Sequence, residues 1–451
     1  MVVILGAGLA GLSASFHINN QNCIIFEKNN YATGHIHSEN INGFTWDEGP
    51  HVSFTENEYV KNLFSESVDN DLLEYPVKTV NYFEGAWISH PAQTNLYAVP
   101  EPLRSECLAD FLKARFSYED NFVPQNYQEW LNYSFGETFT NTFPAAYTRK
   151  YWTTNPSLLT TDWVGKRVFF PKIDQVKEGY IQPLKEETHY IKKIRYPNNG
   201  GFMSFAQKLL TNSNINLRHE LQSIDFDNRQ IVFTNGETVK YQRLINTIPL
   251  PLLIAKSNAP GHIKEAASNL NCSSVLLVNV TANHQTARPE NWIYVYDEDK
   301  YSTRINCTEL LSPNNAPPGK TGIQVEVYFS AYKPKVETDE IIAQKVMIEL
   351  IEMGLVRDIE SIETYHTKWV QWANVIFDHK RIENLDIVLN YLVPYGLKRE
   401  EDDLDSMTNW TEKISTNQNL GDIILAGRFG QWKYYWTDDC VLRGKFISEN
   451  I

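Results

Sequence analysis

The chain lacks several features that would define its class at once. No run of 18 apolar residues occurs among its 451 positions, so the sequence predicts no membrane span. The first residues, MVVILGAG, contain neither a basic segment nor a cleavage site, and no secretory leader is expected. The five cysteines stand far apart without a C-x-x-C pair, a pattern that favours a reducing, cytoplasmic location over disulfides or a zinc site.

Positive charge is also scarce. With 41 basic and 55 acidic residues the formal net charge is −14, which argues against a nucleic-acid partner because such a partner requires a basic face. A small anionic substrate remains compatible with this balance, since a few local arginines can hold one inside an acidic protein. Hydrophobic residues make up 42% of the chain, so we expect a globular protein of two or three domains.

The N-terminus follows the pattern of a dinucleotide-binding unit. Residues 2–5 predict a buried strand and residues 9–18 a helix, with G-x-G-x-x-G formed by Gly6, Gly8 and Gly11. Gly6 allows the tight turn, Gly8 lets a pyrophosphate approach the backbone, and Gly11 lets helix and strand pack closely. The phosphates would lie at the helix N-terminus.

A second predicted strand ends at Glu27, 19 positions after Gly8, where a carboxylate accepts hydrogen bonds from a ribose hydroxyl. The stretch that follows, YATGHIHSENINGFTWDEGPHVSF, resembles the second conserved stretch of the flavin amine-oxidase and protoporphyrinogen-oxidase superfamily. In that superfamily a glycine pair follows the acid, and a D-x-G-x-H turn reaches the flavin ring. Here Thr33 and Gly34 replace the pair, and His51 ends the turn. The resemblance implies FAD, with Gly34 and His51 among its contacts.

The same stretch contains an H-x-H pattern, His35 and His37. Two histidines so spaced can chelate a metal ion. No third ligand is suggested nearby, so we predict no metal site.

Longer blocks resemble one branch of that superfamily, the UDP-galactopyranose mutases, and particularly their eukaryotic-type form. The blocks occur in family order over nearly the whole chain: YQEWLNYSFGETFTNTFPAAYTRKYWTTNPSLLTTDWVGKRVFFPK, IRYPNNGGFMSFAQKL, YVYDEDKYSTRINCTELLSP, YHTKWVQWANVIFDHKR and LAGRFGQWKYYWTDD. The resemblance implies an α/β fold: a Rossmann-like FAD-binding domain, a mixed-sheet substrate domain and a helical insertion. We expect the FAD-binding domain to be discontinuous (1–60, 196–260 and 415–451), around a helical insertion at 61–195 and a sheet-containing substrate domain at 261–414.

The resemblance also implies an unusual chemistry on a nucleotide-diphosphate sugar. In these mutases the reduced flavin is a nucleophile toward the anomeric carbon, and the sugar ring opens and recloses at another size without net redox change. NADPH and NADH are candidate reductants. The oligomeric state is left open.

Substrate contacts are implied for residues that match the mutase pattern. Two guanidiniums, Arg167 and Arg304, would clamp the diphosphate and stabilise it as a leaving group, which makes them catalytic with His51. Both could instead form salt bridges, and the matching aromatic residues could instead pack in the core. The other implied substrate contacts are Gln93, Trp152, Tyr294, Asn374 and Tyr434.

Cofactor contacts beyond the N-terminal segment are implied for Leu221, Gly427, Arg428, Asp438 and Asp439. His51 would stabilise reduced flavin or help to move its proton, or else serve the structure alone.

Three departures from the mutase pattern bear on the substrate. His90 and Ala92 stand where aromatic residues pack against the uracil, and Asn374 stands where the family has a tyrosine that contacts phosphate. Asp438 and Asp439 replace amides near the flavin's pyrimidine, where two carboxylates disfavour an anionic reduced flavin unless one is protonated or turned away.

Three local expectations complete the sequence interpretation. Residues 243–253, RLINTIPLPLL, read as a buried strand, and a helix should begin near Thr437 and Asp438, whose side chains suit an N-cap. The charged segment 398–413 reads as a solvated surface.

Two other functions remain open. One is a redox flavoenzyme of the same fold, an amine oxidase or a protoporphyrinogen-oxidase-like dehydrogenase, with net two-electron oxidation and a more apolar pocket. The other is a flavin-binding protein without turnover.

Overall fold

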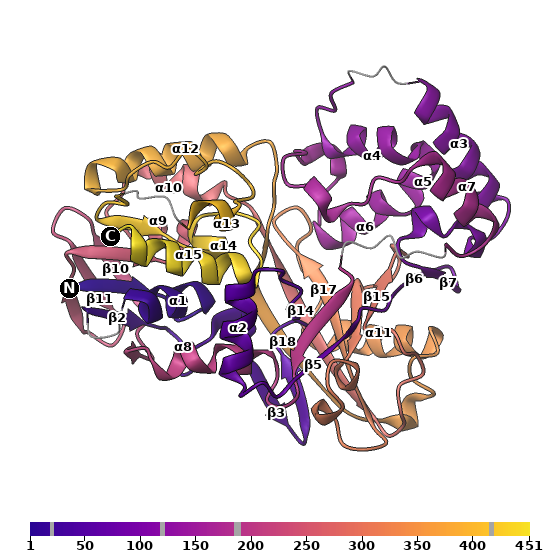
Figure 1. Cartoon of the computed structure of the whole chain (residues 1–451), viewed down its shortest axis with the longest axis horizontal. Helices are drawn as coiled ribbons and strands as arrows, with labels where there is room; N and C mark the ends of the chain where they lie inside the picture. Colours follow the sequence, from indigo (N-terminus) through magenta and orange to yellow (C-terminus); the bar gives the residue numbers. More distant parts are fainter. Residues whose placement is uncertain (19–21, 118–121, 185–190, 415–418) are drawn as a thin grey trace.

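The computed structural model of the chain describes residues 1–18, 22–117, 122–184, 191–414 and 419–451. The expected α/β class with parallel and mixed sheets is confirmed. Figure 1 shows a parallel sheet at the left with helices above and below it, a large sheet in the centre, and a separate group of helices at the upper right. The boundary expected at residue 415 lies outside the described residues, and the three-part division stays a prediction.

A five-stranded parallel sheet forms the Rossmann-like unit, in the order β19-β13-β1-β2-β9. Its strands come from distant parts of the chain: β1 (Val2–Leu5), β2 (Cys23–Phe26), β9 (Ile215–Asn216), β13 (Arg243–Asn246) and β19 (Ile423–Leu425). The strand predicted at 2–5 and the helix predicted at 9–18, α1 (Leu9–Ile18), are confirmed. Near-continuous burial of the central strands is the pattern of a parallel sheet covered on both faces.

Glycine permits the close packing around α1. A Cβ on Gly11 would stand 2.1 Å from the carbonyl oxygen of Gly6, so only glycine lets α1 approach the end of β1. On another side, α15 (Thr437–Glu449) packs along α1, and a Cβ on Gly444 would lie 2.5 Å from the amide nitrogen of Ala14. The C-terminal helix is thereby brought beside the first glycine loop (Figure 1).

The central sheet has seven strands, in the order β18-β14-β17-β16-β15-β6-β7. One face is covered by α11 (Asp339–Glu352), whose apolar residues join the core of β14 and β17. The strands are β6 (Thr79–Phe83), β7 (Ala86–Ser89), β14 (Cys272–Ala282), β15 (Trp292–Val295), β16 (Arg304–Cys307), β17 (Thr321–Phe329) and β18 (Ile362–Val375).

Smaller sheets connect these parts. A three-stranded antiparallel sheet joins β10 (Leu221–Asp225), β11 (Gln230–Phe233) and β12 (Thr238–Lys240). Two antiparallel pairs remain: the hairpin of β3 (Ser38–Ile41) with β4 (Phe44–Asp47), and the long-range pair of β5 (Leu72–Pro76) with β8 (Lys193–Pro197).

The helices fall into two sets. Those of the insertion stand apart at the upper right of Figure 1: α3 (Leu103–Ser117), α4 (Tyr127–Phe135), α5 (Glu137–Thr142), α6 (Pro144–Tyr151) and α7 (Ile173–Ile181). The others are α2 (Glu58–Ser67), α8 (Gln207–Thr211), α9 (Leu250–Ala255), α10 (Gly261–Ser268), α12 (Arg381–Leu392), α13 (Trp410–Lys413) and α14 (Gly427–Gly430). Within the described residues no helix combines the length and the apolar character that crossing a membrane requires.

The strand expected over 243–253 was wrong in its extent. It ends at Asn246, and α9 follows, because Pro249 and Pro251 occupy its cap and first turn, where a missing N–H costs nothing. The helix expected to begin near Thr437 and Asp438 is confirmed, since α15 begins at Thr437. Its N-cap, however, is Trp436, whose N–H donates to the Asp439 carboxylate at 2.8 Å, rather than Thr437 or Asp438.

The charged segment 398–413 is a solvated surface only in part: five of its nine charged residues are exposed, but two of its acids are held by buried cations. Its Asp402 accepts from the fully buried Lys433 at 3.0 Å, and its Glu400 pairs with the buried Arg443 at 2.7 Å. Buried cations of the C-terminal region therefore hold this segment in place, because an unpaired buried charge would be strongly destabilising.

Candidate functional site

The glycine loop has the geometry of a phosphate cradle. Gly6 has φ +98°, a conformation that favours glycine. A Cβ on Gly8 would meet no atom closer than 4.0 Å, so packing within the chain does not require glycine there, whereas a ligand approaching the backbone would. Glu27 directly follows β2, and its Oε2 accepts from the N–H of Ala7 at 2.9 Å. These residues fit the diphosphate and ribose of a dinucleotide.

His51 lies in the turn after β4 and is held in one tautomer. Its Nδ1 donates to the carbonyl of Gly49 at 2.7 Å. Burial, helped by the nearby positive charges of Arg428, His35 and Arg304, lowers the pKa of His51 to about 4. The ring is therefore neutral at physiological pH, and its Nε2 is the atom left to act on a ligand.

Arg304, on β16, lies inside a cage of polar and aromatic groups. It forms a bidentate ion pair with Glu326 of β17, its register partner, and its Nη2 donates to the Tyr328 hydroxyl at 2.9 Å. The guanidinium also lies 5.0 Å from the ring centre of Tyr151. The side chain of Glu326 is only 4% exposed, so this carboxylate neutralises part of the charge that an anion would meet.

Arg167 ends a short 3-10 turn, Gly165–Arg167. Its guanidinium is sandwiched between the rings of Tyr434 and Trp436, at 4.4 and 4.3 Å from their centres. Nη2 donates to the Tyr434 carbonyl at 2.9 Å, and Nη1 contacts the Met407 sulfur. Such stacking supports a cation at this position.

Arg428, on α14, connects Arg167 and Arg304. Its Nε and Nη2 donate to the Tyr435 carbonyl, and its Nη1 reaches Asn374 Oδ1 at 3.3 Å. The same Asn374 oxygen accepts from the Tyr151 hydroxyl at 3.3 Å, and the Arg428 guanidinium lies 5.7 Å from the Tyr434 ring. The structure thus brings Arg167, Arg304 and Arg428 into one connected network.

Tyrosine hydroxyls fill the space between these cations. Burial raises the pKa of four tyrosines above the ordinary value of this side chain: Tyr147, Tyr151, Tyr294 and Tyr328. Each hydroxyl therefore keeps its proton at neutral pH and can donate it in a hydrogen bond. The rings of Tyr147 and Tyr151 are stacked at 5.6 Å. The arrangement suits a ligand with several anionic oxygens.

Five of these participants were missed from the sequence: Tyr147, Tyr151, Glu326, Tyr328 and Trp436. Tyr147 and Tyr151 are four residues apart on α6, a spacing that places both on one helix face and could have indicated them. Glu326 gave no sequence signal, since its role depends on the pairing of β16 with β17.

Asp439 is the second of two aspartates at the start of α15, and its pKa is raised. Burial, together with the charge of Asp438, raises the pKa of Asp439 to about 7, while Arg167 and Arg428 oppose the shift. One of the two carboxyls is therefore partly protonated at neutral pH. This removes much of the repulsion that two carboxylates would exert on an anionic cofactor.

The remaining predicted residues are spread around the network. Trp152 is buried edge-on against Tyr434 at 5.4 Å. Gln93 lies farther out, with its amide donating to the Phe169 carbonyl at 3.1 Å, and Leu221 is buried at the start of β10. The start of β10 lies near Glu27 of the dinucleotide cradle, since the N–H of His219, two residues before the strand, donates to the Glu27 carbonyl at 2.7 Å.

The segment that contains His90 and Ala92 is also held by contacts across strands. His90 Nδ1 hydrogen-bonds to Asn81 at 2.9 Å, and its ring lies 5.0 Å from that of Tyr294, tilted by 45°. Ala92 is buried. His90 and Tyr294 thereby form an aromatic surface that leads into the tyrosine cluster.

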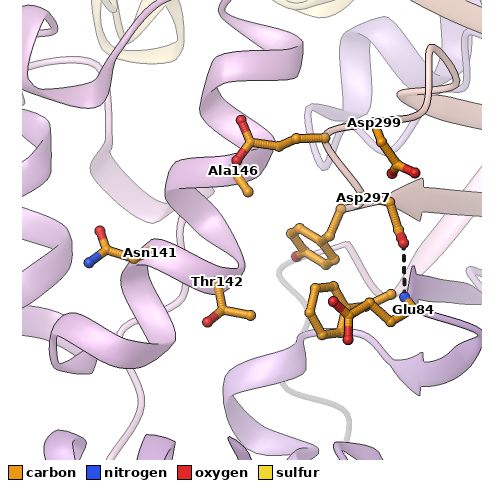
Figure 2. Close-up of a pocket in the computed structure, with 9 residues that line it drawn as sticks. Glu84, Asn141, Thr142, Ala146, Asp297 and Asp299 are labelled. Atoms are coloured by element: carbon orange, nitrogen blue, oxygen red, sulfur yellow. Dashed lines mark hydrogen bonds between the residues drawn. The ribbon is translucent and has the colours of Figure 1, made fainter.

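A cavity of about 390 Å³ opens between the insertion helices and the end of β15 (Figure 2). Its lining includes Glu84, Asp297, Glu298 and Asp299, and the Glu84 N–H donates to Asp297 at 3.0 Å. Four carboxylates would repel a diphosphate, so the arginine network is the better candidate for an anionic substrate.

The fold and the dinucleotide cradle define a flavin-dependent class of enzyme. A family model described as flavin containing amine oxidoreductase matches residues 9–445, and the chain belongs to this family. The resemblance to the flavin amine-oxidase superfamily is thereby confirmed, and with it a flavin cofactor of the FAD type.

Solved structures with the same fold include mutases, oxidases and isomerases. Reduced UDP-galactopyranose mutase has a TM-score of 0.86 and 22% identity, over 98% of this chain and 93% of that one. A putative protoporphyrinogen oxidase from Exiguobacterium sp. 255-15 has a TM-score of 0.70 and 16% identity, over 99% of this chain and 97% of that one. A CLA-producing fatty acid isomerase from P. acnes has a TM-score of 0.60 and 13% identity, over 99% of this chain and 97% of that one. At these identities the likeness concerns the fold, and the eukaryotic-type branch stays a prediction.

Proposed function

We propose that the chain is a mutase-like flavoenzyme that interconverts the pyranose and furanose forms of a nucleotide-diphosphate sugar. The observation that carries the proposal is the network of three arginines, interleaved with protonated tyrosines, beside His51. Such a site suits a diphosphate, whereas an amine substrate, itself a cation at neutral pH, has no use for several cations.

Arg304 and Arg167 would both contact the substrate. Arg304 is fixed by Glu326 and Tyr328, and Arg167 by its aromatic sandwich. Between them a diphosphate would accept hydrogen bonds from both guanidiniums, which would stabilise the charge of the departing nucleotide. Less freedom is lost on binding because the partners already hold both side chains.

Tyr294 and Tyr434 would donate hydrogen bonds from their hydroxyls to the same phosphates. Trp152 would form one wall of the sugar pocket. His90 would offer its ring to the base in place of the family's aromatic residue. Gln93 would have to leave the Phe169 carbonyl to reach the base, a movement of one side chain.

On the cofactor side, the glycine loop, Glu27, Gly34 and Gly427 would hold FAD, and Leu221 would flank its adenosine end. Bound reduced flavin supplies a nucleophile for the anomeric carbon. The neutral His51 imidazole would accept or return a proton at Nε2, and a protonated Asp439 would avoid opposing the negative charge of a reduced cofactor.

Ligand binding tests the substrate class without requiring turnover. The holoprotein should change its flavin absorbance spectrum with UDP, UDP-galactose and related nucleotide sugars at micromolar to millimolar concentrations, and should not respond to primary amines. A response to amines with silence toward every nucleotide diphosphate would reject the proposal and favour a two-electron oxidase.

A further inference from the structure

A short turn crosses the glycine loop where phosphates are expected. The N–H of Thr33 donates to the Ala7 carbonyl at 2.8 Å, and a Cβ on Gly34 would lie 2.9 Å from Gly8 Cα. His35 follows in the 3-10 turn Gly34–Ile36. The sequence therefore places an imidazole immediately after the residue that touches the phosphate loop.

A buried carboxylate holds this imidazole. His35 Nδ1 lies 3.0 Å from Glu48 Oε1, and Lys368 Nζ of β18 lies 3.0 Å from Glu48 Oε2. Burial opposes ionisation of Glu48, but the hydrogen bond from His35 and the charges of His35 and Lys368 outweigh it and lower the pKa of Glu48 to about 2. The carboxylate is thus ionised at every physiological pH and fixes the ring.

The other edge of the ring is open toward the cofactor side. The His35 side chain is 41% exposed, whereas that of Glu48 is 9% exposed. The ring packs edge-on against Phe429 of α14 at 5.5 Å, and its charge contributes to the lowered pKa of His51. Within the part of the chain that the structure describes, Nε2 has no hydrogen-bond partner. His35 therefore lies among the glycine loop, α14 and the His51 turn.

We infer that His35 is a further cofactor-binding residue, whose Nε2–H donates to the diphosphate of bound FAD. Glu48 is its positioning residue, and Lys368 fixes Glu48 from the central sheet. An imidazole between a carboxylate and a phosphate can carry both ring protons, so it donates one hydrogen bond to each anion and neutralises part of their charge. The inference depends on the flavin cofactor alone and is independent of the proposed substrate.

The H-x-H motif supplies a matched control. His37 lies two residues away, but its ring stacks on Tyr31 at 3.8 Å, and its Nδ1 lies 3.4 Å from the Thr33 hydroxyl rather than against a carboxylate. His35→Gln and His37→Gln therefore remove the same group from the same turn, and only the first removes the one that faces the cofactor.

FAD affinity of the apoprotein, titrated through quenching of flavin fluorescence, tests the inference without any substrate. We expect His35→Gln to raise the Kd for FAD about tenfold or more, and His37→Gln to change it less than about twofold, since the lost bond is charge-assisted. Phosphorus-31 NMR of the bound FAD should show at least one of its two phosphate resonances displaced in His35→Gln.

A His35→Gln variant with wild-type affinity and unchanged phosphorus resonances would overturn the inference. If that variant does not fold, Glu48→Gln decides the matter, because it keeps the shape of the side chain and removes only the charge that holds the ring. We then expect FAD affinity about threefold or more weaker, with a displaced phosphate resonance. Unchanged values in folded Glu48→Gln would equally overturn the inference.

Discussion

The ion pair of Arg304 with Glu326 allows stability and binding to be separated. Replacing Arg304 by Met leaves the Glu326 carboxylate, 4% exposed, without its cation. Breaking a buried pair in this way costs about 3–5 kcal/mol, and since Arg304 itself is 23% exposed we expect about 3 kcal/mol. The double variant Arg304→Met/Glu326→Gln removes both charges and should recover most of that loss.

Binding of UDP should follow a different order. Glu326→Gln frees the donors that Glu326 now occupies, so its affinity for UDP should equal or exceed that of the wild type. The double variant lacks the guanidinium and should bind UDP about 10- to 150-fold more weakly, which corresponds to about 1.5–3 kcal/mol for charge-assisted hydrogen bonds.

Urea denaturation followed by tryptophan fluorescence gives the stability order, and titration calorimetry with UDP gives the affinities. Both variants that carry Glu326→Gln lack the buried carboxylate, so the comparison between them isolates the arginine. If the double variant binds UDP as tightly as Glu326→Gln does, Arg304 does not contact the diphosphate and the reasoning fails.

Three further predictions concern the cofactor side. Gly8→Ala should fold normally and lose FAD affinity. Gly11→Ala should instead lower the apoprotein's melting temperature, because its Cβ would lie 2.1 Å from the Gly6 carbonyl oxygen. The opposite pattern would refute the assigned roles. The raised pKa of Asp439 means that the native state binds the extra proton between about pH 4 and 7, so the free energy of unfolding should fall as pH rises through this window, and Asp439→Asn should flatten that slope in urea titrations. The lowered pKa of His51 has the opposite effect: the free energy of unfolding should increase as pH rises from about 4 to 6.5. This increase should be absent in His51→Gln, and an unchanged slope in that variant would contradict a buried neutral ring.

The sequence predicts most reliably what depends on local geometry. Gly11 answers a constraint set within a few residues, the carbonyl of Gly6, and the strand and helix around the first loop were predicted at their observed bounds. The strand expected to continue past Asn246 failed for a local reason as well. Prolines in a first helical turn look the same in sequence as prolines at the end of a strand.

Contacts between distant segments were beyond the sequence. The charged segment 398–413 carries acids whose partners, Lys433 and Arg443, are buried in the C-terminal region, and charge density alone suggested solvent. Glu326 and Glu48 likewise gain their roles only when the strands pair. The two arginines of the diphosphate pattern were identified through family resemblance, because no local rule distinguishes them from residues of surface salt bridges.

The most direct test of the proposed function is turnover with the flavin in a defined redox state. Purified holoprotein would be reduced anaerobically with dithionite and given UDP-galactopyranose and UDP-galactofuranose separately, with the products resolved by chromatography. We expect interconversion with reduced flavin, none with oxidised flavin, and no net change in flavin redox state. Nucleotide-sugar binding without conversion would point to another sugar or nucleotide. Net oxidation of a substrate, with no ring interconversion of any nucleotide sugar that binds, would contradict the mutase account.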